Sequence, residues 1–457
     1  MTFSPQARIL DLGDGFFDPV APADFPDTIL RYRNDRAAAE IGLDALTDAE
    51  WIARFGRFQP FDGSLPQPLA LRYHGHQFRN YNADLGDGRG FLYAQMLDAS
   101  GRLMDLGTKG SGRTPWSRSG DGRLTLKGGV REILATEMLE AFGVDTSRTF
   151  SLIETGEELQ RGDEPSPTRS AVLVRLSHGH IRIGSFQRFA YLRDPESISA
   201  LARYCLINLY GEEPGETPEL QLFAHVVAGT ARLAASYMAA GFVHGVLNSD
   251  NISITAESFD YGPWRFTPYW DPTFTAAYFD QTGLYAFGRQ AQAIHWDVAQ
   301  LAMALSTVVD IEALAPILDR FAGLYEGEMT ALLLRRLGVT PRGEAQDIAL
   351  IGHIERALAQ CTVEIDRFFF DWRGGALRAP SAAYDHPVFA PFVEAIADYE
   401  AAAPLDHPYW ADAAPCSMHI EEVEAIWAPI AAADDWSALH AKVAAIRRMG
   451  AALDQTR

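Results

Sequence analysis

The chain has 457 residues, of which 39 are basic and 60 are acidic, and its net charge is −21. This length suffices for two or three ordinary domains or for one large two-lobed enzyme. The negative charge opposes binding to the phosphate backbone of nucleic acid and to an anionic membrane surface, so neither is expected as a partner.

Cysteine usage and hydropathy favour a cytoplasmic protein. The cysteines Cys205, Cys361 and Cys416 form no C-x-x-C pair, so neither a disulfide framework nor a zinc site is predicted. Asp11 and Asp14 precede any apolar run, which argues against a secretory signal. The most apolar long stretch, "LFAHVVAGTARLAASYMAAGFVHGVL", contains an arginine and two histidines and therefore predicts a core helix, not a membrane span.

The first part of the chain predicts strands around one helix. Residues 1–65 contain no chemical motif and are expected to form an extension packed on the core that follows. The stretch "GFLYAQMLDASGRLMDLGTK" (90–109) predicts a β-hairpin with Gly101 in its turn and Lys109 at the end of its second strand. In "LTLKGGVREILATEMLEAFGV", apolar residues recur at helical spacing up to Gly143, which predicts a helix after the hairpin.

Two Gly-rich segments flank the strand that ends at Lys109. They are "LGDGRG" (85–90) and "SGDGR" (119–123). Glycines let backbone N–H groups approach phosphate oxygens, and Arg89 and Arg123 lie nearby for anion pairing. Each segment alone fits an ordinary β-turn, but two copies beside one strand favour a phosphate site.

Lys109 and Glu132 form a second candidate pair. A lysine on a strand and a glutamate on the next helix reproduce the order of the kinase ion pair that holds nucleotide phosphates. Taken alone, the two residues would fit solvated surface charges better, because lysine and glutamate are mostly exposed. The motifs downstream favour the functional interpretation.

Three more strands are predicted at "SRTFSLIET", "AVLVRLS" and "HIRIGSF". A hairpin turning at His178 and Gly179 would place Arg175 directly opposite Arg182. Like charges across a strand pair are destabilising unless an anion lies between them, so the pair indicates a phosphate site. Two splayed surface arginines are the alternative.

From about residue 196 the chain predicts helix after helix, including "PELQLFAHVVAGTARLAASYMAAG" and "DVAQLAMALSTVV". A strand-rich part followed by a helical part is the layout of protein kinases. We therefore predict an α+β, two-lobed protein-kinase-like fold, in which a strand-rich N-lobe contains one key helix and a larger C-lobe is helical. The predicted units are an N-terminal extension (1–65), a nucleotide-binding N-lobe (66–195) and a C-lobe (196–457).

The octapeptide "HGVLNSDN" resembles the kinase catalytic loop H-R-D-L-x-x-x-N. His244 and Asn251 match the pattern, but Val246 occupies the place of the catalytic aspartate, and an acid appears instead at Asp250. Nine residues after the asparagine, Asp260 begins "DYG". A lone D-Y-G would be only a turn, but in this order the asparagine and Asp260 offer hard oxygen ligands to Mg²⁺.

Several motifs together resemble those of the selenoprotein O family, which are protein-kinase-like AMP transferases. They run in order from about residue 73 to residue 275 and include "YHGHQF", "LGDGRG", "TKGSGRTPWSRSGDGR", "VREILATEML", "AVLVRLSHGHIR", "HGVLNSDNISI" and "DYGP". The resemblance implies a kinase fold that binds ATP in a flipped orientation. The α-phosphate would then face the acceptor, and AMP would be transferred to a protein Ser, Thr or Tyr hydroxyl. An acid at Val246 is not required, because the reacting phosphorus lies elsewhere.

The resemblance also implies roles for individual residues. Asp250 is the expected base, and Asn251 and Asp260 are expected to bind Mg²⁺ or Mn²⁺. The residues expected to hold the nucleotide are Gly86, Gly88, Arg89, Lys109 with Glu132, Asp121, Gly122, Arg175 and Arg182. The expected partners are ATP and acceptor proteins, and a monomer is the working assumption.

The chain departs from the family pattern at three places. Arg79 replaces the glycine of the usual "HQFG", and "DAAPCSMHIEEVEAI" stands where the family has N-P-x-x-x-P-R-N-H. Ala276 lies about where some members have a cysteine that pairs with one near the C-terminus. The last departure argues against redox control by that disulfide.

Three alternatives to AMP transfer stay open. UMP transfer from UTP with Mn²⁺ would use the same residues. Ordinary phosphotransfer requires a base at the γ-phosphate, against which Val246 argues. A nucleotide-binding pseudokinase scaffold would need no metal ligands, so the presence of Asn251 and Asp260 argues against it.

Overall fold

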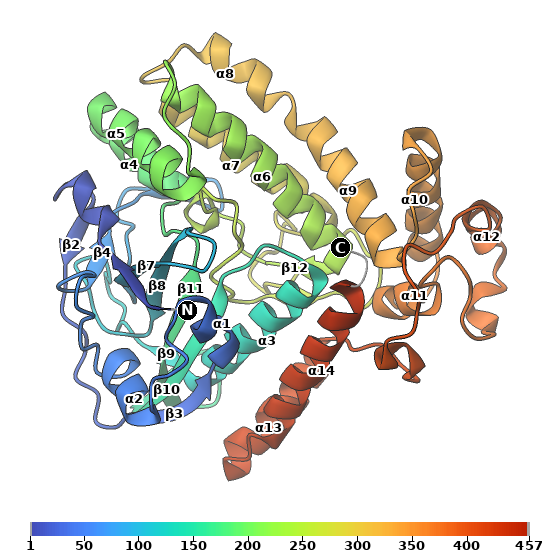
Figure 1. Cartoon of the computed structure of the whole chain (residues 1–457), viewed down its shortest axis with the longest axis horizontal. Helices are drawn as coiled ribbons and strands as arrows, with labels where there is room; N and C mark the ends of the chain where they lie inside the picture. Colours follow the sequence, from blue (N-terminus) through green and yellow to red (C-terminus); the bar gives the residue numbers. More distant parts are fainter. Residues whose placement is uncertain (1, 455–457) are drawn as a thin grey trace.

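The computed structural model of the protein describes residues 2–454 (Figure 1). Its strands are β1 (Ser4–Gln6), β2 (Phe17–Pro19), β3 (Ile29–Arg33), β4 (Leu69–Leu71), β5 (Gly75–Gln77), β6 (Asn80–Asn82), β7 (Leu92–Leu97), β8 (Leu103–Lys109), β9 (Leu124–Thr125), β10 (Arg148–Leu159), β11 (Thr168–Ser177), β12 (Phe242–Val243) and β13 (Arg265–Phe266). Its α-helices are α1 (Asp35–Glu40), α2 (Asp48–Phe55), α3 (Leu126–Phe142), α4 (Ile183–Leu192), α5 (Pro195–Cys205), α6 (Pro218–Ala240), α7 (Gln290–Leu305), α8 (Ile311–Leu318), α9 (Phe321–Leu337), α10 (Glu344–Ala359), α11 (Ile365–Asp371), α12 (Ala390–Ile396), α13 (Ile420–Ala433) and α14 (Ser437–Asp454). The result is a mixed α/β structure with one large sheet and many helices.

A nine-stranded antiparallel sheet organises the first part of the chain. Its strand order is β2-β4-β7-β8-β11-β10-β3, with β1 paired to β7 and β9 paired to β11. The predicted hairpin is confirmed as β7 and β8, and Gly101 in its turn has φ +84°, a conformation that favours glycine. Lys109 ends β8 as predicted, and the strand is buried along its whole length. The sheet thus holds Lys109 in a rigid interior position.

Residues near the N-terminus form part of this sheet. Strands β2 and β3 pair with β4 and β10, and they lie at its two ends. Helix α2 begins with a capping box at Thr47, and its Trp51 stacks on Phe150 of β10 with ring centroids 4.9 Å apart. The segment therefore completes the sheet and covers one of its faces.

The predicted helix after the hairpin is confirmed as α3. Thr125 caps its N-terminus by accepting a hydrogen bond from the N–H of Gly128, and Gly143 ends it in a left-handed conformation with φ +80°. Ile133, Leu134 and Met138 are fully buried, and the helix packs against β10 and β11. Burial of this apolar face fixes α3 on the sheet.

The strand predicted at "HIRIGSF" is wrong, and so is the hairpin turning at His178 and Gly179. Most of the segment forms α4, with Arg182 at its N-cap position. Both edges of β11 are already occupied, by β8 and β10, so no edge remains on which a returning strand could pair. Ile183, Phe186 and Phe189 follow helical spacing and are buried in the core.

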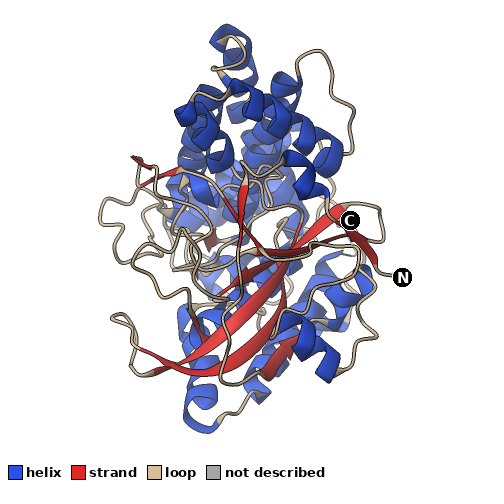
Figure 2. Ribbon diagram, turned by 90° about the vertical axis from the view of Figure 1, so that its left-hand side faces the viewer, coloured by secondary structure: helices blue, strands red, loops and turns tan. Residues whose placement is uncertain are grey.

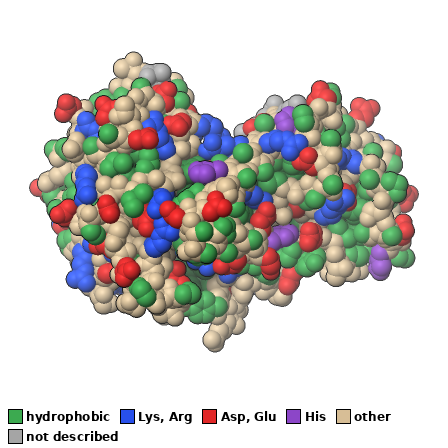
Figure 3. Space-filling model, turned by 90° about the horizontal axis from the view of Figure 1, so that it is seen from below, with side chains coloured by type: hydrophobic (Ala, Val, Ile, Leu, Met, Phe, Trp, Pro, Cys, Tyr) green, Lys and Arg blue, Asp and Glu red, His purple; other side chains and the backbone are tan. Residues whose placement is uncertain are grey.

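The rest of the chain is mainly helical, as predicted. The long helix α6 packs against α7 and α9, and Figure 2 shows most helices gathered beyond one side of the sheet. No helix within residues 2–454 is both long and apolar enough to cross a membrane. Acidic and basic side chains are interspersed on the face seen in Figure 3.

Candidate active site

A cavity of about 640 Å³ lies between the sheet and the loops that follow α6. Most of the residues that the sequence predicts for the site line this cavity. They are Gly86, Gly88, Arg89, Lys109, Asp121, Gly122, Arg175, Arg182, Asp250 and Asp260. Glu132 and Asn251, the other two predicted residues, stand outside its lining and contact residues near it. The fold therefore gathers residues from 86 to 260 around one space.

Lys109 bridges two carboxylates at the inner end of the cavity. Its ammonium group forms an ion pair with Glu132 of α3, and its Nζ lies 2.6 Å from Oδ1 of Asp260. Burial disfavours the charge of Asp260, but Lys109 and Arg89 outweigh it and hold the pKa of that carboxyl well below its usual range. Asp260 also has φ +61°, an uncommon conformation for a residue other than glycine. The carboxylate of Asp260 therefore stays ionised beside Lys109.

Arg175 and Arg182 meet at an aromatic ring and not across two strands. Arg175 is a residue of β11, and its guanidinium carbon lies 5.0 Å from the centroid of the Phe259 ring. The guanidinium carbon of Arg182 lies 4.9 Å from the same ring and 4.2 Å from the ring of Tyr73. The predicted proximity of the two arginines therefore has a different cause, because aromatic faces attract both cations.

Hydrogen bonds connect Arg182 to Asp250, in the loop that resembles the kinase catalytic loop, and to Asp87. It donates through Nη1 to the backbone oxygen of Asp250, at 3.0 Å, and through Nη2 to Oδ1 of Asp87, at 3.3 Å. The Nε atoms of Arg175 and Arg182 are buried and have no partner among the described residues. Buried donors of this kind suit an anion.

Asp250 is the acid closest in sequence to the missing kinase aspartate, and it is 7% exposed. Burial raises the pKa of its carboxyl to about 6, although Arg182 opposes the shift. Its Oδ1 has no hydrogen-bond partner among residues 2–454. Gly75 of β5 faces this carboxyl so closely that a Cβ on Gly75 would lie 2.8 Å from Oδ1.

The short hairpin β5–β6 is what places Gly75 there. The N–H of His76 donates to Oγ of Ser249 at 2.8 Å, and the N–H of Phe78 donates to Oδ1 of Asn248 at 3.0 Å. The 3-10 turn Ser249–Asn251 is thereby held against the hairpin. These contacts fix the position of the loop that contains Asp250.

Asn251 and Asp260 fit the donor set of a hard divalent cation. Asn251 donates its amide Nδ2–H to the backbone oxygen of Val246 at 3.0 Å, so the amide oxygen is the atom it can offer to a metal. Asp260 offers a carboxylate that its cationic neighbours keep ionised. Mg²⁺ commonly takes one or two protein oxygens and completes its shell with phosphates and water.

Both Gly-rich segments pack against residues 112–117 in the wall of the cavity. A Cβ on Gly86 would lie 2.4 Å from Cγ of Trp116, and a Cβ on Gly122 would lie 2.2 Å from the backbone oxygen of Gly112. Gly122 also has φ +71°. Glycine is thus required here for close packing and backbone conformation, whatever else the loops bind.

Arg161 also lines the cavity and was not predicted, and its partner lies far away in sequence. Asp121 forms an ion pair with Arg161, whose Nη1 lies 2.8 Å from Oδ2. Arg161 comes from the polar loop after β10, which offered no signal of function. Arg123, considered above for anion pairing, instead donates to both carboxylate oxygens of Glu157.

A family model described as "Protein adenylyltransferase SelO" matches residues 1–380. A protein of Synechocystis sp. named "Protein nucleotidyltransferase YdiU" is 46% identical, with 82% of this chain and 79% of the relative covered. Proteins of the same name are 43% identical in Synechococcus elongatus, covering 96% and 94%, and 50% identical in Gloeobacter violaceus, covering 73% and 69%.

Proposed function

The chain belongs to the protein adenylyltransferase SelO family and is a nucleotidyltransferase, and from this premise we propose that it transfers AMP from ATP to Ser, Thr or Tyr hydroxyl groups of proteins. Pyrophosphate would be the second product. ATP would bind flipped relative to kinases, with its α-phosphate toward the acceptor. The observation that carries the proposal is the location of the acid, because position 246 is a valine and Asp250, which lines the cavity, has a buried carboxylate oxygen without a hydrogen-bond partner among the described residues.

In this proposal the nucleotide occupies the cavity between two lobes of a kinase-like fold. The cavity is bounded by β8 and β11 on one side and by the loops of Asp250 and Asp260 on the other, which supports this layout. The unit boundaries near residues 66 and 196 stay predictions. Backbone around Gly86, Gly88 and Gly122 would line the nucleotide.

Lys109, Arg175 and Arg182 would bind the β- and γ-phosphates, which leave as pyrophosphate. Attack at the α-phosphorus develops negative charge on this leaving group, and preorganised cations stabilise such charge. The buried and unpartnered Nε atoms of the two arginines support this role. Glu132 would hold Lys109 in place.

Asp250 would accept the proton of the attacking hydroxyl. A carboxyl whose pKa is raised to about 6 is a stronger base than an ordinary aspartate and is still mostly ionised at neutral pH. Asn251 and Asp260 would hold Mg²⁺ or Mn²⁺, which when bound neutralises phosphate charge.

The experiment uses ATP labelled on the α- or the γ-phosphate, in parallel, with the purified protein and Mg²⁺. We expect covalent α-label and no γ-label on the protein or an added acceptor. Asp250→Ala should lose transfer and keep ATP binding. Covalent γ-label would instead indicate a kinase, and ATP binding without any label would indicate a scaffold. The same assay with UTP and Mn²⁺ tests UMP transfer.

A further inference from the structure

The helix that contains Glu132 is held from outside by the C-terminal helices. In Figure 1, α13 and α14 (red) run beside α3 (teal), although about 300 residues separate them in sequence. The opposite face of α3 packs on β10 and β11. The family model matches only residues 1–380, so α13 and α14 lie beyond it.

One ion pair joins the middle of α3 to α14. The Glu137 side chain on α3 is 3% exposed, and Arg447 on α14 binds both of its oxygens, with Nη2 2.6 Å from Oε1 and Nε 2.8 Å from Oε2. The hydroxyl of Tyr32 donates to the same Oε1 at 2.7 Å. A two-point contact between a guanidinium and a buried carboxylate fixes both distance and orientation.

Further contacts hold the two ends of α3. At its N-terminal end, Lys127 pairs with Glu424 of α13 at 2.8 Å. At its C-terminal end the helices approach so closely that a Cβ on Gly450 would lie 3.3 Å from Cα of Ala141.

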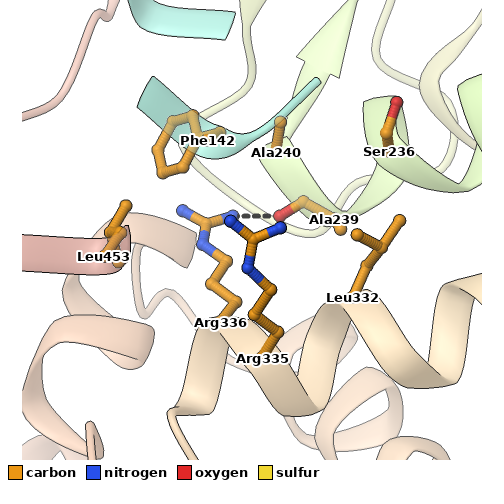
Figure 4. Close-up of a pocket in the computed structure, with 8 residues that line it drawn as sticks. All are labelled: Phe142, Ser236, Ala239, Ala240, Leu332, Arg335, Arg336 and Leu453. Carbon is orange, nitrogen blue, oxygen red and sulfur yellow. Dashed lines mark hydrogen bonds between the residues drawn. The ribbon is translucent and has the colours of Figure 1, made fainter. Parts of the chain in front are cut away.

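Figure 4 shows the same junction, where Leu453 of α14, Phe142 of α3 and Arg336 of α9 line one small pocket. Arg336 donates to the backbone oxygen of Ala239 there and stacks on Phe142. The C-terminal helices thus contact α3 at its start, its middle and its end.

Glu132 lies five residues before Glu137 on the same rigid helix, about 7.5 Å along its axis. Displacement of α3 would withdraw Glu132 from Lys109. Lys109 would then keep Asp260 as its carboxylate partner, and Asp260 is the proposed metal ligand.

We propose that the α13–α14 hairpin positions α3 so that Glu132 can hold Lys109 in the nucleotide site, with Arg447 as the positioning residue. This inference rests on the proposed function of that site. Arg447 does not line the cavity, and besides Glu137 of α3 it contacts Tyr32 and Asn34. Any effect on the site would therefore pass through the position of α3. The bidentate contact at Glu137 adds to the apolar packing of α3 on the sheet and fixes the helix relative to α14.

The test compares Arg447→Ala with Arg448→Ala. Arg448 is the next residue on α14, and it pairs with Asp412 at the surface, so it is a matched control. We expect Arg447→Ala to lower kcat/KM for ATP about tenfold or more and to raise the Mg²⁺ concentration needed for half-maximal activity. Arg448→Ala should match the wild type in both, at a temperature where all variants are folded.

Two further variants separate positioning from stability alone. If Arg447 acts through Glu132, adding Arg447→Ala to Glu132→Gln should cost little more than Glu132→Gln alone. Arg447→Lys keeps the charge but loses the two-point contact, so it should show an intermediate kcat/KM, and it serves as the test if Arg447→Ala does not fold.

Wild-type kcat/KM in both Arg447 variants, or a full additive loss in the double variant, would overturn the inference. Wild-type protein that transfers no α-label would instead contradict the proposed function itself.

Discussion

Substitution of Gly75 tests the proposed role of Asp250 as the base, because Gly75 faces its carboxyl. In Gly75→Ala, the new Cβ would lie 2.8 Å from Oδ1 of Asp250 and 2.9 Å from its Cβ. Carbon atoms in favourable contact lie about 3.5–4.0 Å apart, so the Asp250 side chain has to move by roughly 0.5–1 Å. The backbone cannot follow freely, because Arg182 binds the backbone oxygen of Asp250 and the neighbouring Ser249 is bonded to His76.

This displacement sets the expected size of the effect. A misplacement of about 1 Å at a reacting group can cost about 100-fold in rate. We expect kcat for AMP transfer to fall about 10- to 100-fold, which corresponds to about 1.4–2.7 kcal/mol of transition-state stabilisation. ATP affinity should stay close to that of the wild type, because Gly75 does not line the cavity. Overpacking should also lower the free energy of unfolding, by about 1–3 kcal/mol.

The assay is transfer of α-label at saturating ATP, with ATP affinity measured by calorimetry and folding by thermal denaturation. Gly327→Ala is the control, since its position on α9 is exposed and a Cβ there meets no atom within 4 Å. It should keep wild-type activity. A folded Gly75→Ala protein with wild-type kcat would refute the assignment of Asp250 as the base.

Three other predictions follow from the same geometry. Glu132→Gln removes one of two carboxylates around Lys109 and should lower kcat/KM about tenfold or more, about 1.4 kcal/mol, measured by initial rates of transfer; an unchanged value would contradict the role of the pair. Arg182→Lys keeps the charge but loses the planar fork, so calorimetry should show weaker ATP binding by about 1–3 kcal/mol, and equal affinity would argue against phosphate contact. Asp297 is buried with neither oxygen bonded within residues 2–454, and burial together with nearby Asp250 raises the pKa of its carboxyl well above its usual range. Because the unfolded chain ionises this group near pH 4, the wild type loses stability as pH rises from there toward the raised folded pKa. The stability gain of Asp297→Asn, measured by urea unfolding, should therefore be larger at pH 8 than at pH 5, and an equal gain at both would contradict this account of the burial.

Local patterns in the sequence predicted the elements that depend on local chemistry. The hairpin turning at Gly101 and the helix ending at Gly143 are both present, because each relies on a glycine with positive φ and on simple periodicity. The predicted ion pair of Lys109 and Glu132 is present, but its prediction required the motifs downstream as well as the order of the two residues.

Features that depend on tertiary neighbours could not be read in this way. The segment after His178 alternates briefly like a strand, but both edges of β11 are taken and the chain turns into α4. The Arg161 pair with Asp121 and the Arg447 pair with Glu137 join positions 40 and 310 residues apart, and no local pattern indicates such contacts.

The proposed AMP transfer is tested most directly by the intact mass of the protein and of an added acceptor after incubation with ATP and Mg²⁺. We predict that the modified species gains the mass of one AMP unit and that pyrophosphate appears in solution. Both should vanish in Asp260→Ala, which lacks the proposed metal ligand. A gain of one phosphate unit with release of ADP would contradict the flipped nucleotide and the role given to Asp250.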